Sequence, residues 1–138
     1  MLFRSVHTHA TYATALSMLR REIPAAHYMI AAFGGPTIRC TDYAPYGTQA
    51  LSELVVEGLR DRNGVLLGNH GMIVIGRDLD EAMWRAVELE TLAKQFTIAS
   101  LVGDPVILPD DEIMRTVERF SGYGLQRAVV PTRKRTTK

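Results

Sequence analysis

Short apolar segments of strand length alternate with longer segments of helical periodicity along the sequence. Alternating apolar and polar residues predict strands, whereas apolar residues that recur every three or four positions predict helices. On this basis, strands are predicted at residues 2–9, 37–41 and 65–75. Helices are predicted at about 11–22, 49–62, 79–102 and 110–120. Interleaved strands and helices favour a layered α/β architecture in which helices cover a sheet.

The ends of the predicted helices carry residues with known capping roles. Thr48 is expected to cap the second helix, and Asp78 with Glu81 forms the Asp-x-x-Glu variant of a capping box before the third. Pro24 is expected to end the first helix, and Asn63-Gly64 to supply a left-handed stop for the second. The third helix is the longest, and its expected buried stripe consists of Ala82, Ala86, Leu89, Ala93 and Phe96.

The composition is that of an ordinary globular domain. Of the 138 residues, 46% are hydrophobic and 22% are charged, which at this length is enough for one buried core without disulfides. The single cysteine, Cys40, cannot form an intrachain disulfide, which fits a reducing cytoplasm. No run approaches the ~20 apolar residues of a membrane span, and the first residues lack the apolar run of a signal peptide. We therefore expect a cytoplasmic protein without a membrane partner.

The charge is unevenly distributed along the chain. The formal net charge is +1, but residues 127–138 hold five basic residues and no acidic residue, so the rest of the chain is net acidic. A basic end is either a nucleic-acid contact or a solvated, disordered tail, and a short terminal Lys/Arg/Thr run is more commonly the second. We therefore expect one domain over residues 1–126, a disordered tail over 127–138 and no nucleic-acid partner.

Three of the four histidines are spaced as the ligands of a metal site would be. His7 and His9 alternate on a predicted strand, so their imidazoles project from the same face, about 6.6–7 Å apart along the strand. His70 follows 61 residues after His9, between Gly68 and Gly71. Glycines inside an apolar strand indicate a break where the backbone closely approaches another segment. Catalytic zinc commonly takes three protein ligands and keeps one position open. Histidine pairs on strands are more often structural or exposed, so the spacing alone leaves both interpretations open.

A series of segments between about residue 6 and residue 124 matches the pattern of a known protein family. The segments are Val6-His7-Thr8-His9, Ile23-Pro24-Ala25-Ala26-His27-Tyr28-Met29-Ile30-Ala31-Ala32, Tyr46-Gly47-Thr48, Asn69-His70-Gly71, Leu79-Asp80-Glu81-Ala82-Met83-Trp84 and residues 120–124. In order and spacing they resemble the class II aldolase/adducin family, and they cover nearly all of the chain. The resemblance implies a three-layer α/β/α domain with a mixed, largely antiparallel sheet.

The resemblance also implies roles for individual residues. In the family, the histidines that match His7, His9 and His70 hold a zinc ion, for which another divalent metal can substitute. The tyrosine that matches Tyr28 is contributed to a neighbouring subunit's site, where it acts in proton transfer at the aldehyde. The tyrosine that matches Tyr123 helps to close the site. Family members form ring-shaped tetramers, so the resemblance implies a homotetramer.

The activity implied by the resemblance is that of a zinc-dependent aldehyde-lyase. Such an enzyme cleaves a small phosphorylated ketose by a retro-aldol reaction through a metal-bound enediolate. Alternatives within the family are a pentulose-phosphate 4-epimerase and enzymes that dehydrate or decarboxylate sugar-acid phosphates. An adducin-like interaction domain without catalysis is the alternative from another class, but it would not require the three histidines. The fourth histidine, His27, matches no family ligand and is expected to serve in packing or at an interface.

The sequence departs from the family pattern at its beginning. Family members have a substantial segment before the His-x-His strand, which supplies phosphate-binding loops and a catalytic glutamate, and neither feature maps onto this chain. The chain therefore resembles an N-terminally truncated domain: a fragment of a longer aldolase, a short metal-binding protein, or one half of a two-chain site. Without that cover, we expect exposed apolar surface at residues such as Val6 and Val74, and a poorly soluble or strongly oligomeric chain.

Overall fold

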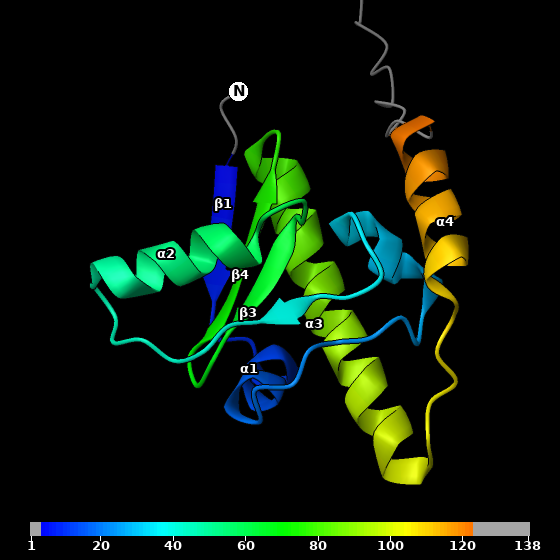
Figure 1. Cartoon of the computed structure of the whole chain (residues 1–138), viewed down its shortest axis with the longest axis horizontal. Helices are drawn as coiled ribbons and strands as arrows, with labels where there is room; N and C mark the ends of the chain where they lie inside the picture. The colour runs from blue at the N-terminus through cyan, green and yellow to red at the C-terminus, as the bar shows by residue number, and fades with distance from the viewer. Residues whose placement is uncertain (1–3, 123–138) are drawn as a thin grey trace, which may run out of the picture.

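The computed structural model describes residues 4–122 (Figure 1). The strands are β1 (Arg4–Thr8), β2 (Arg39–Cys40), β3 (Gly64–Leu67) and β4 (Gly71–Gly76). The α-helices are α1 (Thr11–Met18), α2 (Gln49–Gly58), α3 (Leu79–Val102) and α4 (Asp110–Gly122), and a 3-10 helix, η1, spans Tyr28–Phe33. The expected domain end at residue 126 and the expected tail at 127–138 lie outside the described residues.

The strands form one sheet in the order β1-β4-β3-β2. β4 lies antiparallel to both β1 and β3, whereas β2 runs parallel to β3, so the sheet is mixed and largely antiparallel, as expected. The strand residues predicted at 65–75, with a break at the glycines around His70, form a hairpin of β3 and β4, because residues 68–70 turn the chain back on itself. The strand predicted at 37–41 is shorter: β2 holds two residues, and Ile38 before it forms an isolated bridge with Ile23.

Helices lie on both faces of this sheet. Gly64 of β3 lies against Leu89 of α3, whereas the next residue, Val65, lies against Gly58 of α2. Because adjacent residues on a strand point to opposite faces, α3 and α2 cover opposite faces. Figure 1 shows α2 in front of the sheet and α3 behind it. α1 contacts α3, β3 and β4, and therefore shares the α3 face. The expected three-layer α/β/α arrangement is confirmed.

The main core lies between the sheet and the helices α1 and α3. Met72 and Val74 of β4 alternate onto that face and are buried. The stripe predicted for α3 is buried as expected and also includes Leu92. The expected exposure of Val74 is wrong, because β4 is a central strand between β1 and β3 and α3 covers its inner face. Val6, on the edge strand β1, is half-buried and packs against the same core.

α1 is shorter than the sequence pattern predicts. It ends at Met18 instead of near residue 22. Arg20 has a left-handed backbone with a φ of 48°, and its amide donates to the carbonyl oxygen of Ser17 at 3.0 Å. This tight turn leads the chain away from the helix before Pro24 is reached, so the expected role of Pro24 as the stop is wrong.

α2 begins as predicted but ends differently. The side chain of Thr48 caps its start by accepting a hydrogen bond from the amide of Leu51. After Gly58, the residue with a left-handed backbone is Asp61, with a φ of 55°, and not Asn63 as predicted. Gly64 is instead the first residue of β3, where a side chain would collide with the core.

α3 carries the predicted cap in a modified form. The carboxylate of Asp78 accepts a hydrogen bond from the amide of Glu81 at 2.8 Å. Glu81 reaches back to the amide of Arg77, one residue before the cap, at 2.6 Å. Both ends of the capping box are therefore satisfied, and the acidic first turn complements the helix dipole.

The apolar segment 29–33 lies within the 3-10 helix η1. Nδ1 of His27 accepts a hydrogen bond from the amide of Met29 at 3.2 Å and so caps the start of η1. Gly34 ends it in a left-handed conformation, with a φ of 87°. Among residues 4–122, no helix combines the length and the apolar character needed to cross a membrane.

Candidate metal centre

Three histidines from two segments of the chain meet at one end of the sheet. His7 lies on β1, His9 follows the last residue of that strand, and His70 lies in the turn between β3 and β4. Thr8 pairs with Met72 in the antiparallel register, so the end of β1 lies beside that turn (Figure 1). The three imidazole rings are 4.9 to 5.0 Å apart between their centroids. The β1–β4 pairing thus gathers the histidines singled out in the sequence.

The nitrogen atoms of the three rings lie close enough together that they could hold one metal ion. One ligand nitrogen from each ring can be chosen such that all three lie within 4.8 Å of one another. The Nε2 atoms of His7 and His9 are 3.2 Å apart, close to the ~3.3 Å between two nitrogens bound tetrahedrally to one zinc. Nδ1–H of His7 donates to the carbonyl oxygen of Met72 at 2.8 Å, which leaves the lone pair of Nε2 for a metal ion.

Two glycines allow the turn that carries His70 to pack closely against other segments. A Cβ atom at Gly68 would stand 2.5 Å from the carbonyl oxygen of Thr41. A Cβ atom at Gly71 would stand 2.5 Å from the carbonyl oxygen of Thr8. Real Cβ atoms do not approach other atoms this closely, so neither position accepts a side chain without movement. The close backbone approach predicted from the flanking glycines is confirmed.

Asn69 holds the same turn against the end of α1. Its backbone is left-handed, with a φ of 58°, a conformation that asparagine tolerates better than most residues. Its amide donates to the carbonyl oxygen of Ser17 at 3.0 Å, and its Oδ1 accepts from Nε of Arg20 at 3.0 Å. Arg20 also forms an ion pair with Asp42 at 3.3 Å. The position of His70 therefore depends on contacts made by the residue before it.

The surroundings of His70 favour its neutral form. Burial lowers the pKa of His70 from its ordinary value of 6.5, and positive charge on His7 and His9 lowers that pKa further. A metal ligand must be the neutral imidazole, because protonation removes the lone pair that binds the ion. His7 and His9 are exposed and His70 is half-buried, so an ion held by the three rings would face solvent on one side.

Comparison with known proteins shows the family of this chain. The family described as the class II aldolase and adducin N-terminal domain has a model that matches residues 5–97, more than half of the chain. This chain belongs to the class II aldolase and adducin family. The membership expected from the sequence segments is thereby confirmed.

Within this family the chain is similar to several aldolases. It is 47% identical over 122 residues to an L-fuculose phosphate aldolase of Escherichia coli (strain K12), a match that covers 88% of this chain and 57% of that protein. It is 46% identical over 119 residues to a 5-methylthioribulose-1-phosphate/5-deoxyribulose-1-phosphate aldolase of Rhodospirillum rubrum, covering 86% and 54%. A solved L-fuculose 1-phosphate aldolase matches with a TM-score of 0.82 and 40% identity, covering 85% of this chain and 55% of the other. The chain thus spans about half the length of the relatives it matches.

Of the two tyrosines expected to act in catalysis, the structure describes only Tyr28, which is not part of the histidine cluster. Tyr123 lies outside the described residues. Tyr28 begins η1, which packs against α3 and α4 away from the β3–β4 turn, and 52% of its surface is exposed (Figure 1). The ring of His27 stacks on that of Tyr28 at 4.9 Å between centroids. The structure thus assembles the three histidines within one chain and places Tyr28 on a different part of the surface.

Glu90 is a polar residue of structural importance that the sequence pattern does not single out. It lies on α3, and its two carboxylate oxygens accept hydrogen bonds from the amides of Tyr12 and Ala13 at 2.9 Å each. These amides belong to the first turn of α1, directly after the His7–His9 segment. The available signal in the sequence is indirect: α1 begins after Ala10, whose side chain cannot cap a helix.

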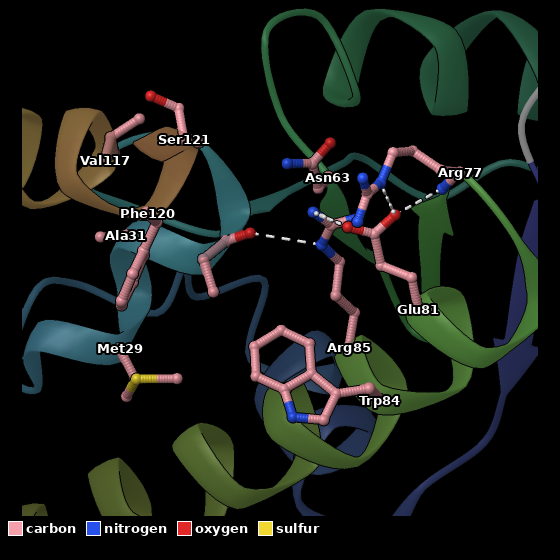
Figure 2. A pocket seen from close by; sticks show the side chains of 12 residues that line it. Met29, Ala31, Asn63, Arg77, Glu81, Trp84, Arg85, Val117, Phe120 and Ser121 are labelled. Carbon is pink, nitrogen blue, oxygen red and sulfur yellow. Dashed lines mark hydrogen bonds and ion pairs between the residues drawn. The ribbon is translucent and has the colours of Figure 1, made fainter. Parts of the chain in front are cut away.

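A cavity of about 490 Å³ lies between η1, α3 and α4 (Figure 2), and none of the three clustered histidines lines it. Figure 2 shows the carboxylate of Glu81 between the guanidinium groups of Arg77 and Arg85. Nε of Arg85 also donates to the carbonyl oxygen of Ala32 in η1 at 3.3 Å. Because these charged groups bind one another and the backbone, the polar end of the cavity serves to connect α3 to η1.

Proposed function

We propose that this chain carries the metal centre of a zinc-dependent class II aldolase, an aldehyde-lyase that cleaves a small phosphorylated ketose. The observation that supports the proposal most directly is the convergence of His7, His9 and His70, whose ligand nitrogens lie within 4.8 Å of one another. The similar proteins support the substrate class, because L-fuculose phosphate and 5-deoxyribulose 1-phosphate are both phosphorylated ketoses. Since the chain spans about half of those proteins, the activity of the whole enzyme belongs to the proposal.

The residues of the chain prepare this centre for a metal ion. A divalent ion bound here supplies Lewis-acid stabilisation of the negative charge that develops on the ketone-derived half of the substrate. The carbonyl oxygen of Met72 fixes the tautomer and orientation of His7. The lowered pKa of His70 keeps that ligand neutral. Three protein ligands leave at least one position for a substrate oxygen, and the exposure of His7 and His9 makes that position accessible.

The proposed cleavage of a ketose 1-phosphate breaks the bond between C3 and C4. The C4 hydroxyl loses its proton as an aldehyde forms, and C3 gains a proton to give dihydroxyacetone phosphate. Tyr28 of a neighbouring subunit is proposed to hold or move the proton at the aldehyde oxygen, and Tyr123 to close the site. The exposure of Tyr28 supports a role in another subunit's site. A homotetramer and a cytoplasmic location are parts of the same proposal. The family's catalytic glutamate and phosphate loops are assigned to no residue of this chain.

Elemental metal analysis of the purified protein tests the metal centre. The parent chain is expected to contain close to one zinc per chain, and His7→Ala and His70→Ala are each expected to lose it. His27→Ala is the matched control, because His27 is an exposed histidine that caps η1, and it should keep the metal. Absence of metal in the parent, even after zinc is added, would rule the centre out.

An enzymatic assay separates the metal centre from the activity. The zinc-loaded protein is incubated with L-fuculose 1-phosphate or 5-deoxyribulose 1-phosphate, and dihydroxyacetone phosphate is detected through a coupled NADH-dependent reductase. Release that disappears in His70→Ala supports the aldolase. Zinc binding without release would retain the metal centre and reject cleavage of these substrates by this chain. Inversion of a pentulose phosphate at C4 without net cleavage would indicate the epimerase instead.

A further inference from the structure

We infer that Glu90 is a positioning residue for the metal centre: it fixes the start of α1 and, through it, the position of His9. The inference rests on the proposed metal centre, but the contacts that carry it lie outside the three ligands. Glu90 belongs to α3, whose neighbouring residue Leu89 is fully buried. α3 contacts β1, β4 and α1, so its backbone is well fixed relative to the sheet.

The start of α1 depends on Glu90 because the helix has no cap of its own. The first amides of a helix have no partner within the helix and require an acceptor. Ala10 is at the N-cap position and has only a methyl group, and residues 11–14 include no acid. Glu90 supplies both missing features, since its carboxylate accepts from Tyr12 and Ala13 at 2.9 Å and places negative charge at the positive end of the helix dipole.

His9 lies between two fixed points of the backbone. On one side, Thr8 is the last residue of β1, and its Oγ1 accepts a hydrogen bond from the amide of Ala10 at 2.9 Å. On the other side, Tyr12 is held by Glu90. Only three residues separate the last strand position from the amide that Glu90 binds. Release of the start of α1 therefore gives His9 freedom relative to His7, which remains in the sheet.

The far end of α1 is connected to the third histidine. The carbonyl oxygen of Ser17, in the last turn of α1, accepts from the amide of Asn69, the residue before His70. α1 thus links the segment that carries His9 to the turn that carries His70. A shift of α1 would move both ligands, and Glu90 attaches the first amides of this short helix to the longer α3.

The substitution Glu90→Gln tests this role, because it keeps the size of the side chain but removes its charge and one of its two acceptor oxygens. Zinc affinity, measured by competition with a chelator, is expected to fall about 10- to 100-fold, the range found for residues that orient metal ligands. The absorption spectrum of the cobalt-substituted protein is expected to change as the ligand geometry changes. Glu88→Gln, the same change two residues away on α3, is the control and should match the parent.

A rescue variant distinguishes positioning from a general loss of stability. Ala10→Ser provides α1 with its own cap, and in the Glu90→Gln background it is expected to restore most of the zinc affinity. If Glu90→Gln does not fold alone, the double variant is compared with Ala10→Ser by the same measurements. The inference would be overturned if Glu90→Gln bound zinc as tightly as the parent. It would also be overturned if Ala10→Ser restored the melting temperature of Glu90→Gln but not its zinc affinity.

A measurement without metal separates this inference from the proposed function. In the metal-free protein, Glu90→Gln is expected to shift the imidazole proton resonances of His9 and to leave those of His27 in place. If the parent binds no zinc but this shift occurs, the metal centre is rejected and the positioning of His9 is retained. If zinc binds to the parent but neither the resonances nor the affinity change in Glu90→Gln, the positioning role is rejected and the metal centre is retained.

Discussion

The backbone of Gly71 lies against the carbonyl oxygen of Thr8, so that a Cβ atom on Gly71 would stand 2.5 Å from that oxygen and 3.0 Å from Cδ2 of His9. Gly71→Ala is therefore expected to force β1 and β4 apart beside the histidines. We expect a loss of about 1–3 kcal/mol in the free energy of unfolding, typical of overpacking, and a loss of bound zinc. Denaturant unfolding and metal analysis measure the two effects.

Gly103→Ala is the control for this prediction, because a Cβ atom at Gly103 would have no neighbour within 4 Å. It should change the free energy of unfolding little and keep the metal content of the parent. If Gly71→Ala behaves like Gly103→Ala, the contact between β1 and the turn does not determine the geometry of the centre.

Arg85 of α3 is largely buried and forms hydrogen bonds to the backbone of β4 and of η1. It pairs with Glu81 at 3.2 Å, and Nη1 donates to the carbonyl oxygen of Ile75 in β4 at 2.8 Å; 14% of the Arg85 side chain is exposed. Arg85→Met would leave the Glu81 carboxylate and backbone oxygens without this partner, so we expect the free energy of unfolding to fall by about 2–4 kcal/mol. Arg115→Met removes ion pairs from an exposed helix surface and should cost less than about 1 kcal/mol. Equal effects in urea unfolding would contradict this argument.

The lowered pKa of His70 predicts a pH dependence of the metal-free protein. The unfolded chain gains a proton on this imidazole near pH 6.5, whereas the folded protein gains it at lower pH, because burial and the charges of His7 and His9 disfavour the charged form. The contribution of His70 to stability is therefore intact above pH 6.5 and is lost as the pH falls through the lower folded value. The melting temperature should fall less between pH 7 and pH 5 in His70→Gln than in the parent. A parallel decline in both would exclude His70 as a source of the effect.

Cys40 is predicted to be an unreactive thiol. Burial raises its pKa from 9.0 to about 11; the charge of Arg20 opposes this effect, and that of Asp42 adds to it. The thiolate is the reactive form, so at pH 8 alkylation by iodoacetamide should be about a hundredfold slower than for an exposed cysteine. The rate should rise with a midpoint near pH 11 in the folded protein and near pH 9 in denaturant. A midpoint near 9 in both states would show that the thiol is not protected.

Several elements follow from local sequence because their causes are local. The helix starts at Thr48 and Asp78 were predicted from side chains that bind amides two or three residues away. The break between β3 and β4 was indicated by Gly68 and Gly71, since only glycine tolerates the close approach found there. The buried stripe of α3 follows from its periodicity. In each case, the contact that matters lies within a few residues or is required by the residue type itself.

Other features had no local cause and were mispredicted or missed. The burial of Val74 depends on β4 having strands on both sides, which its own sequence does not show. The early end of α1 depends on the turn at Arg20 that leads Ile23 to its pairing with Ile38. The cap of α1 comes from Glu90, which is 78 positions from Tyr12.

Local sequence therefore determined the α/β class and the shared face of His7 and His9, because both depend on backbone geometry that repeats every two or 3.6 residues. It indicated His70 as a candidate third ligand but not its position relative to His7 and His9. Tertiary structure alone decided that His70 meets the rings of His7 and His9 and that Glu90 caps α1. It also decided that Tyr28 lies on the surface apart from the three histidines. The physical reason is that these relationships arise from the pairing of β1 with β4 and the packing of α3, which join segments more than 60 positions apart.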